Sequence, residues 1–581
     1  MTEDVERSRE TNMQQYHRHH LDETQQSWLL GPDDLNKKKN KYVDLGCVVC
    51  SRKALRWTLW SVVIAFFVIA LPIIIAKYLP KHKPRPSPPD NYTLALHKAL
   101  LFFNAQKLKL GDCQRTMEYH GEGTPGYYDG GDNTKYHFPM SFAMTMLSWS
   151  VIEYEHKYRA IGEYDHTRDL IKWGTDYLLL TFNSSASKID KIYSQVGGSR
   201  NGSTTTPDDH YCWERPEDMD YPRPVQTAVS GPDLSGEMAA ALAAASIVFR
   251  DDNSYSSKLV KGAATVLAFA RDRGKRTPYP RGNLYIDPCY NSTGYFDEYM
   301  WGAAWLYYAT GNNSYVSLAT NPGLPQNSKA FFMIPDLSVL SWDNKLPAAM
   351  LLLTRLRIFI NPGYPYEDML RSYQNVTSLT MCSYLQTYHV FNWTRGGLIQ
   401  LNHGGGQPLQ YVANAAFLAS LYVDYMNATG VPGWYCGTSF ITLDVLRTFA
   451  TSQGANPMNM SYVVGYGNKY PKHVNHRGAS IPHDKNKYSC TGGWKWRDSR
   501  NPNPNTITGA MVGGPDRFDR FQDIRTNFSY TQPTMAGNAG LVAALVSLTA
   551  SGGYGIDKNT MFSAVPPLHP LSPPPPPPWK P

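Results

Sequence analysis

Residues 234–250 read LSGEMAAALAAASIVFR, an alanine-rich stretch that indicates a helix packed closely against its neighbours. Two further stretches have the same character, DEYMWGAAWLYYATG at 297–311 and AGNAGLVAALVSLTA at 536–550. Long loops rich in Gly and aromatic residues separate such stretches, including YYDGGDNTKYHF at 127–138 and NLYIDPCYNSTGYF at 283–296. Many helices joined by long loops indicate an all-α barrel or solenoid whose loops carry the chemistry.

The helical pattern continues from residue 91 to residue 556 without a fixed-period repeat or a dividing linker, which predicts one large globular domain. Residues 557–581 form a proline-rich tail that is typical of polyproline II structure and cannot join a core. Aromatic residues make up 13% of the chain, a composition that suits a carbohydrate-stacking surface as well as an ordinary core.

Residues 57–76, WTLWSVVIAFFVIALPIIIA, contain no charge and are long enough to span a bilayer as a helix. The polar residues 1–56 precede this segment, so it does not have the form of a signal peptide. Basic residues before it outnumber those after it, which predicts a single-pass type II membrane protein with a cytoplasmic N-terminus. The uneven net charge of +8 fits this membrane-flanking role better than nucleic-acid binding. Residues 77–90 form a Pro- and Lys-rich stalk.

The cytoplasmic tail, residues 1–56, is polar and is expected to be disordered. Within it, Leu29-Leu30 and the residues from Tyr42 to Leu45 have the form of dileucine and tyrosine-type sorting signals. Patterns this short also arise by chance, so the two signals are hypotheses.

Asn-x-Ser/Thr acceptors for N-glycosylation occur only after the membrane segment, which supports an extracytoplasmic domain. They are Asn91, Asn183, Asn201, Asn291, Asn312, Asn375, Asn392, Asn427, Asn459 and Asn527. Six cysteines also follow the segment, in a compartment that permits disulfides: Cys113, Cys212, Cys289, Cys382, Cys436 and Cys490. Their spacing is too wide for a zinc site, so we expect no metal site and no nucleotide cofactor.

Asp129 and Asp132 lie three residues apart on a loop with two glycines, so the carboxyl groups can converge on one small volume. Such a pair can bind and deprotonate a water molecule. An Asx-type turn and a calcium-binding loop are equally compatible with the spacing, so binding of a structural calcium ion is an alternative.

A second candidate stretch, residues 208–220, places His210 and Trp213 among clustered acidic residues. A tryptophan with polar neighbours is typical of a sugar subsite, where the sugar ring stacks on the aromatic face. A salt-bridged surface loop is the alternative, and the residues alone favour it.

The chain resembles the family 9 glycoside hydrolases, in particular their membrane-anchored endo-β-1,4-glucanases of the KORRIGAN type. The resemblance rests on long motifs along nearly the whole chain, including DGGDNTKYHFPMSFAMTMLSW, DHYCWERPEDMD, EYMWGAAWLYYATG, SYVVGYGNKYPKHVNHRGASIP and FQDIRTNFSYTQPTMAGNAGLVAALVSL. It implies an (α/α)6 barrel, inverting hydrolysis of β-1,4-glucan, and a location at the plasma membrane with cycling through the Golgi and endosomes.

The resemblance also implies roles for individual residues. Asp132 would be the catalytic base, with Asp129 helping to bind the water and Asp523 in support. At the position of the family's acid, a glutamate, this chain has Gln532. A carboxamide has no titratable proton to donate. Asn475 occupies the position of an active-site histidine in the family.

The neighbouring family residues His476 and Arg477 are present, and we expect them to contact substrate together with His210, Trp213 and Trp301. The sequence therefore predicts an endo-β-1,4-glucanase-like protein of cell-wall assembly whose turnover is weakened at two positions. The alternative is a non-catalytic glucan-binding partner of the cellulose-synthesis machinery, and a third reading is a purely structural glycoprotein.

Overall fold

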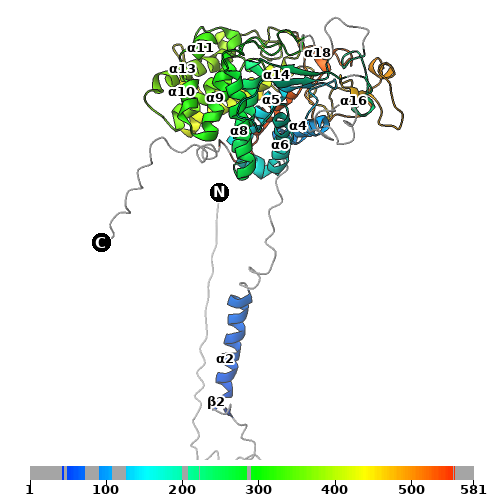
Figure 1. Cartoon of the computed structure of the whole chain (residues 1–581). Helices are drawn as coiled ribbons and strands as arrows, with labels where there is room; N and C mark the ends of the chain where they lie inside the picture. Colours follow the sequence, from blue (N-terminus) through cyan, green and yellow to red (C-terminus); the bar gives the residue numbers. More distant parts are fainter. Residues whose placement is uncertain are drawn as a thin grey trace, which may run out of the picture. The chain divides into compact units, whose positions relative to one another are not determined.

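The computed structural model describes residues 42–44, 49–71, 90–107, 126–198, 207–221, 223–283, 289–553 and 555–556. The chain divides into two units, Met1–Ser87 and Pro88–Pro581, of which the second contains the expected globular domain (Figure 1). The described residues of the first unit form a two-stranded antiparallel pair followed by a helix. These elements are β1 Tyr42–Asp44, β2 Val49–Ser51, α2 Arg52–Ala65 and the π-helical turn η2 Phe66–Ala70.

The predicted transmembrane segment, residues 57–76, lies partly in this helix, while residues 72–76 fall outside the described part of the chain. Among the described residues, none of the helices combines the length and the apolar character that crossing a membrane requires. Of the two predicted sorting signals, Leu29-Leu30 lies outside the described residues and the tyrosine-type signal is described only in part.

Six helices form a closed inner ring in the described part of the second unit. Each contacts the next in chain order, and the last contacts the first. They are α5 His137–Ile161, α7 Pro232–Val248, α9 Phe296–Thr310, α12 Leu346–Phe359, α14 Leu409–Ala428 and α19 Met535–Leu548. Most of their side chains are buried, as in any helix that other helices surround.

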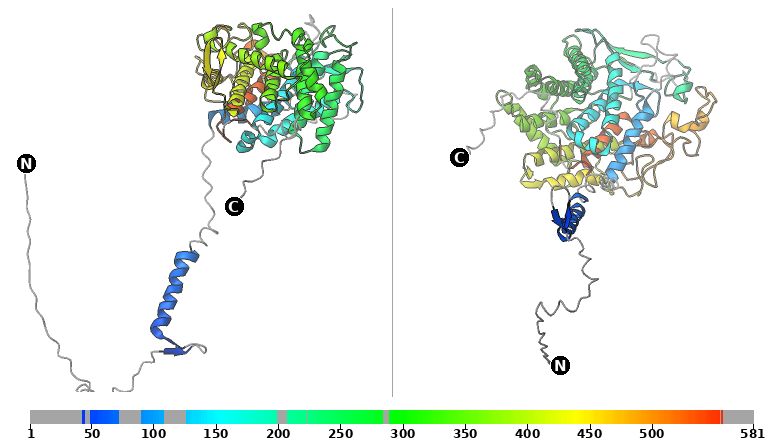
Figure 2. Two further views of the ribbon diagram at one scale, coloured as in Figure 1. Left: turned by 90° about the vertical axis from the view of Figure 1, so that its left-hand side faces the viewer. Right: turned by 90° about the horizontal axis from the view of Figure 1, so that it is seen from below.

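A second set of helices packs around this ring, each mainly against the inner helix that precedes it in sequence, apart from α4, which packs against α19. These are α4 Asn91–Gln106, α6 Tyr164–Leu180, α8 Asn253–Ala270, α10 Asn313–Ala319, α13 Glu367–Ser383 and α15 Leu443–Ser452. Helices α6 and α8 bury one face and expose the other, which is the pattern of an outer layer. The described helices therefore form the expected (α/α)6 barrel, and Figure 2 shows them from two further directions.

The remaining elements are short and lie in the loops. Strands β3 Lys135–Tyr136, β4 Ile192–Val196 and β5 Val225–Ala228 form an antiparallel sheet in that order, and β6 Gly433–Cys436 pairs with β7 Ser439–Thr442. The short helices are α11 Gly323–Asn327, α16 Arg477–Ser480, α17 Trp494–Arg497 and α18 Phe528–Thr531, with 3-10 turns η3 Pro216–Asp218, η4 Pro335–Ser338 and η5 Gln386–Tyr388.

Asp129, Asp132 and Gln532 lie in loops that lead into the N-terminal ends of inner helices. Residues 127–136 precede α5, residues 289–295 precede α9, residues 341–345 precede α12 and residues 532–534 precede α19. The closed ring therefore brings together four loops that are far apart in sequence.

Candidate active site

Asp129 lies buried in the loop before α5 and accepts hydrogen bonds from two other parts of the chain. The hydroxyl of Tyr290 donates to one carboxylate oxygen, and the backbone N–H of Met535, at the start of α19, donates to the other at 3.3 Å. Burial raises the pKa of Asp129 to about 7, and the nearby charge of Asp132 raises it as well, although the Tyr290 hydroxyl acts in the opposite direction. Asp129 is therefore poised to titrate near neutral pH.

Asp132 has the opposite electrostatic environment. Burial alone would raise its pKa, but the hydrogen bond and charge of His210, the charge of Arg477 and the backbone N–H of Thr134 hold the pKa below its usual value. The Asp132 Oδ2 atom lies 3.2 Å from Nε2 of His210. Despite burial, this carboxylate and the neighbouring Cys289 thiol raise the pKa of His210 to about 10. The pair therefore consists of a charged carboxylate next to a charged imidazole.

Two glycines between the aspartates allow other loops to approach closely. A Cβ atom on Gly130 would lie 2.5 Å from the backbone oxygen of Pro533 and 3.2 Å from the side-chain nitrogen of Gln532. The equivalent atom on Gly131 would touch the backbone and side-chain oxygens of Asn475. The structure therefore brings the predicted acid and histidine positions, Gln532 and Asn475, against the aspartate loop.

Neither Gln532 nor Asn475 has an acidic proton that it could transfer to a glycosidic oxygen. The side chain of Asn475 is buried and donates to the backbone oxygen of Arg525 at 2.8 Å. Asp523 accepts from the backbone N–H groups of Lys472 and His473 at 2.8 and 3.0 Å. Asp523 thus fixes the loop that leads to Asn475, a supporting role.

Arg477 and His476 make their polar contacts within the protein, and their contact with substrate stays a prediction. The buried guanidinium of Arg477 donates to the backbone oxygens of Gly131 and Cys212 at 2.9 and 3.0 Å and to that of Asp209. His476 Nδ1 accepts from the backbone N–H of Ala479, and Nε2 lies 3.0 Å from the Gln106 side-chain oxygen.

Burial, together with the charge of Arg477, lowers the pKa of His476 to about 4, so its imidazole is neutral. Gln106 in turn donates to the backbone oxygen of Gly130 at 3.0 Å. Arg477 directly, and His476 through Gln106, therefore stabilise the aspartate loop. Most of their hydrogen-bonding groups already have partners within the protein.

Neither tryptophan expected to line the cleft does so. Trp301 is completely buried in α9, where its ring packs against Trp149 and Trp305. Trp213 is 5% exposed; its ring lies under the Arg477 guanidinium and its indole N–H donates to Ser480. Rings as deeply buried as these two cannot stack on a sugar, so the structure contradicts both expectations. Sequence reveals an aromatic residue but not which side of a helix or loop it occupies.

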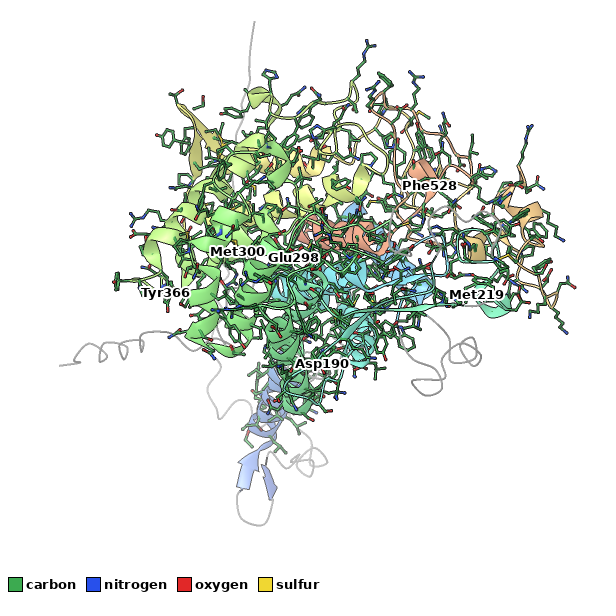
Figure 3. All side chains as sticks on the ribbon, turned by 45° about the horizontal axis from the view of Figure 1, so that its top comes forward. Asp190, Met219, Glu298, Met300, Tyr366 and Phe528 are labelled. Atoms are coloured by element: carbon green, nitrogen blue, oxygen red, sulfur yellow. A yellow bond between two sulfur atoms is a disulfide. The ribbon has the colours of Figure 1, made fainter. Side chains whose placement is uncertain are left out.

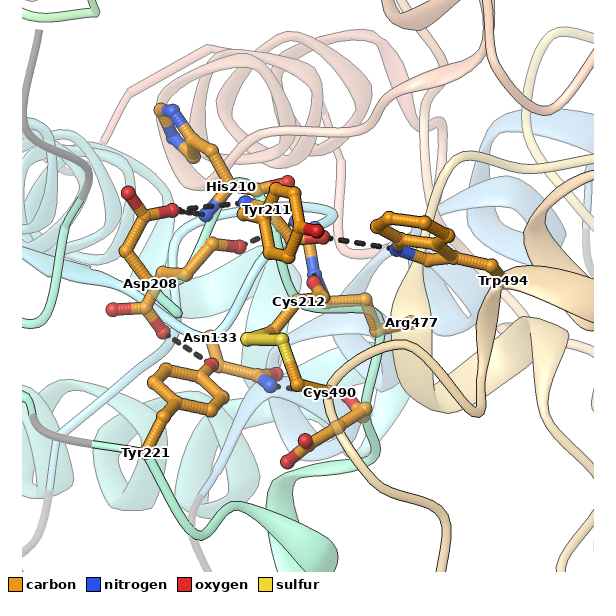
Figure 4. Close-up of a disulfide and its surroundings, with 11 residues drawn as sticks. Asn133, Asp208, His210, Tyr211, Cys212, Tyr221, Arg477, Cys490 and Trp494 are labelled. Atoms are coloured by element: carbon orange, nitrogen blue, oxygen red, sulfur yellow. Dashed lines mark hydrogen bonds between the residues drawn. A yellow bond between two sulfur atoms is a disulfide. The ribbon is translucent and has the colours of Figure 1, made fainter. Parts of the chain in front are cut away.

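A disulfide between Cys212 and Cys490 joins the His210 loop to the loop before α17 (Figure 4). The backbone oxygen of Tyr211 accepts from the Trp494 indole at 3.0 Å beside it. A second disulfide joins Cys382 to Cys436. Cys289 is a free, exposed thiol 3.9 Å from His210, whereas Cys113 lies outside the described residues.

One group of side chains in the described part of the chain has metal-ligand spacing, namely Cys212, Glu214 and Cys490. Both of its sulfur atoms belong to the disulfide and are not available as thiolates.

The residues missed from the sequence are mainly aromatic. Tyr290 donates to Asp129, its ring packs against those of Tyr136 and Trp342, and the Tyr136 hydroxyl lies 3.4 Å from His210. The loop at 283–296 was recognisable as rich in aromatic residues and glycine, but no spacing rule singles out Tyr290 within it.

Of the ten predicted glycosylation acceptors, Asn201 lies outside the described residues. Eight of the other nine are exposed, and Asn527 is partly buried. The structure therefore leaves these positions accessible to glycan attachment.

The sequence model of glycosyl hydrolase family 9 matches residues 92–545. "Endoglucanase 12" of Oryza sativa subsp. japonica is 64% identical over 588 residues, covering 97% of this chain and 94% of that protein. "Endoglucanase 7" of Arabidopsis thaliana is 58% identical over 583 residues, covering 97% of this chain and 93% of that protein.

Solved structures agree with this match. The endoglucanase of the termite Nasutitermes takasagoensis is 29% identical with a TM-score of 0.65, covering 79% of this chain and 98% of that one. Endoglucanase CelQ of Clostridium thermocellum, in complex with cellobiose and cellotriose, is 28% identical with a TM-score of 0.61, covering 81% and 72% of the two chains.

Proposed function

Because this chain belongs to glycosyl hydrolase family 9, whose members include endoglucanases, we propose that it acts on cellulose or a related β-1,4-glucan in cell-wall assembly, by inverting hydrolysis. The endoglucanase names of its plant relatives and the cello-oligosaccharides bound to CelQ support this substrate class. No cofactor is needed for such a reaction, because water, a base and an acid are sufficient.

One observation carries the proposal: the two aspartates of one buried loop have different partners, Tyr290 for Asp129 and His210 for Asp132, and their pKa values are displaced in opposite directions. Asp132, paired with His210, is the charged base that takes a proton from water as the oxygen attacks the anomeric carbon. Asp129 contacts the same small volume and orients that water. A pair of carboxyl groups with separated pKa values is a recurring signature of divided acid–base roles.

The group that should protonate the leaving oxygen is the one that this site lacks. In an inverting enzyme a second carboxyl group, about 6.5–9.5 Å from the base, protonates the departing oxygen. Gln532 occupies the expected position and cannot do so. In the surrounding segment, residues 513–540, the carboxyl groups of Asp516, Asp519 and Asp523 all accept backbone N–H donors. General acid catalysis typically contributes about 10²–10⁴-fold, so we expect slow turnover on natural glucans.

The substitutions at Gln532 and Asn475 favour a second candidate function, a non-catalytic glucan-binding partner of the cellulose-synthesising complex. A carboxamide still hydrogen-bonds a sugar oxygen, so the same cleft would bind glucan without cutting it.

The proposal includes a single-pass type II membrane location at the plasma membrane, with Golgi and endosomal cycling and glycosylation of the extracytoplasmic domain. The exposed apolar side chains of α2, among them Trp57, Trp60 and Val62, support burial of this helix in a lipid environment. Residues 57–76 would form the membrane segment.

The decisive experiment is release of reducing ends from carboxymethylcellulose by the glycosylated protein, compared with Gln532→Glu, Asn475→His and the double variant. Slow release that Gln532→Glu accelerates, and that Asp132→Asn abolishes, supports a weakened enzyme. Silence in the natural chain with turnover in the double variant supports the binding role. Rapid hydrolysis by the natural chain would show that another group donates the proton.

A further inference from the structure

A fully buried ion cluster lies within the barrel, next to the loop that precedes α12. The ammonium group of Lys345 lies 3.3 Å from a carboxylate oxygen of Glu298 and 3.4 Å from one of Glu237, and all three side chains are inaccessible to solvent. Figure 3 shows Glu298 in the interior of the helical body. Although burial lowers the pKa of Lys345, the surrounding carboxylates raise it above its usual value, so the lysine is charged.

The same ammonium group fixes the backbone of residues 341–345. It donates to the backbone oxygen of Trp342, and the backbone N–H of Lys345 donates to Asp297 at 2.7 Å. Within the turn, the backbone N–H of Ser341 donates to the backbone oxygen of Asn344 at 3.1 Å. The ammonium group of Lys345 therefore connects the buried cluster directly to the backbone of Trp342.

Trp342 connects this turn to the catalytic loop. Its indole packs edge-on against the ring of Tyr290, with ring centroids 4.8 Å apart, and also contacts Phe138. The Tyr290 hydroxyl donates to Asp129. A parallel connection joins the two loops, since Thr293 donates through its N–H and hydroxyl to Asp343 at 2.9 and 2.7 Å.

We propose that Lys345 is a positioning residue of the active site: its buried ammonium fixes Trp342, which in turn orients the Tyr290 hydroxyl toward Asp129. Lys345 touches neither substrate nor the reacting atoms. The inference rests on the proposed function, because it assigns Asp129 and Asp132 to the reaction.

A purely stabilising role explains the cluster less well. Withdrawing charges from water costs several kcal/mol per ion, and apolar residues of similar volume are often neutral or stabilising replacements. A buried ion that fixes one geometry has a role that an apolar residue cannot take over. Arg355, on the α12 helix that Lys345 precedes, offers a comparison, because it pairs with Glu153 at 2.9 Å and is equally buried. Glu153 accepts from Trp149 and Tyr425, which lie on the inner helices α5 and α14 and not on the 289–294 loop.

The test compares Lys345→Met with Arg355→Met in the Gln532→Glu background. The groups that face Asp129 are the hydroxyl of Tyr290 and the carboxylate of Asp132. Asp129 orients the water in its charged form, and loss of the Tyr290 donor raises its pKa. Lys345→Met should therefore move the acidic limb of the kcat profile to higher pH, and Tyr290→Phe should do the same. Combined with Tyr290→Phe, it should move the limb no further. Arg355→Met should lower the melting temperature and leave the limb in place.

A readout without turnover separates this inference from the proposed function. We expect Lys345→Met and Tyr290→Phe to be coupled in urea unfolding by about two-fold or more in the equilibrium constant, because distant residues without shared partners are otherwise additive. Arg355→Met and Tyr290→Phe should be additive. If the Gln532→Glu background is inactive, the proposed function fails while this cycle still decides the role of Lys345.

Trp342→Leu covers the case in which Lys345→Met does not fold, since it removes the connecting ring and leaves the ion cluster intact. It should reproduce the shift of the acidic limb and the coupling to Tyr290→Phe. Additive unfolding energies for Lys345 and Tyr290, or a Trp342→Leu profile that matches the parent, would overturn the proposal.

Discussion

A Cβ atom on Gly131 would lie 2.2 Å from the backbone oxygen of Asn475, closer than any real pair of such atoms. The backbone of Gly131, in the loop of the two aspartates, therefore lies directly against the segment that precedes α16. The Arg477 guanidinium and its backbone N–H both donate to the Gly131 oxygen, at 2.9 and 3.0 Å, and so close the same junction from the other side. The absence of a side chain at Gly131 is therefore a condition for bringing Asp132 and Asn475 together.

Gly131→Ala should separate these two loops. We expect a loss of about 1–3 kcal/mol in the free energy of unfolding, as for other overpacked sites, with a larger proportional loss of cellotetraose affinity. Urea unfolding and calorimetry measure the two effects. Gly294→Ala is the matched control, because a Cβ there meets nothing within 4 Å. Equal behaviour of the two variants would contradict this account of the junction.

The raised pKa of Asp129, about 7, predicts a specific dependence of stability on pH. In the unfolded chain this group has its ordinary value of 3.8, so the folded state retains its proton over the interval between the two values. Its contribution to stability is fully present below about pH 4 and is lost as the pH rises through 7.

Asp129→Asn should therefore show a flatter stability curve than the natural chain between these pH values. The difference is of order 1.4 kcal/mol per unit of pKa displacement. Asp233 and Glu214, whose pKa values burial raises to about 6 and 8, contribute to both proteins and cancel in the comparison. Parallel curves from urea unfolding at a series of pH values would show that Asp129 is not perturbed.

The helical framework could be predicted from sequence because it depends on local pattern. The stretches at 234–250, 297–311 and 536–550 coincide with α7, α9 and α19 to within two residues at each end. The alanine-rich composition indicated closely packed helices, and these three helices do pack against their neighbours in the closed ring. The closed (α/α)6 ring was implied by the family resemblance, since no local pattern contains it.

The site was less predictable, because its contacts join residues hundreds of positions apart. The aspartate loop was recognisable from two carboxylates beside two glycines. The burial of Trp301 and the engagement of Arg477 with backbone oxygens were not, since both depend on which elements cover those side chains in the fold. Tyr290 was missed for the same reason: its partner Asp129 is 161 residues away.

His210→Gln should impair the base. The hydrogen bond and charge of His210 lower the pKa of Asp132, so their removal raises it. Because both aspartates act in their charged forms and Asp129 titrates at the higher pH, the acidic decline of kcat/KM should become steeper in the His210 variant in the Gln532→Glu background. His97→Gln offers a control, since His97 pairs with Glu163 away from the aspartate loop. An unchanged profile in the His210 variant would exclude His210 from setting the protonation of Asp132.

The two disulfides should differ in what their removal costs. Cys212–Cys490 closes a loop of 278 residues and lies beside His210 and Arg477, whereas Cys382–Cys436 spans 54 residues and joins α13 to β6. Removing a native disulfide typically costs about 2–5 kcal/mol, more for the longer loop. We expect Cys212→Ala with Cys490→Ala to lose both stability and cellotetraose affinity, because residue 212 also supplies a backbone oxygen to Arg477.

Cys382→Ala with Cys436→Ala should lose stability alone. Thermal unfolding and calorimetric binding, both measured below the melting temperature of the weaker variant, separate the two cases. If both double variants lost affinity to the same extent while folded, the Cys212–Cys490 bond would be a general stabiliser and would not organise the His210 loop.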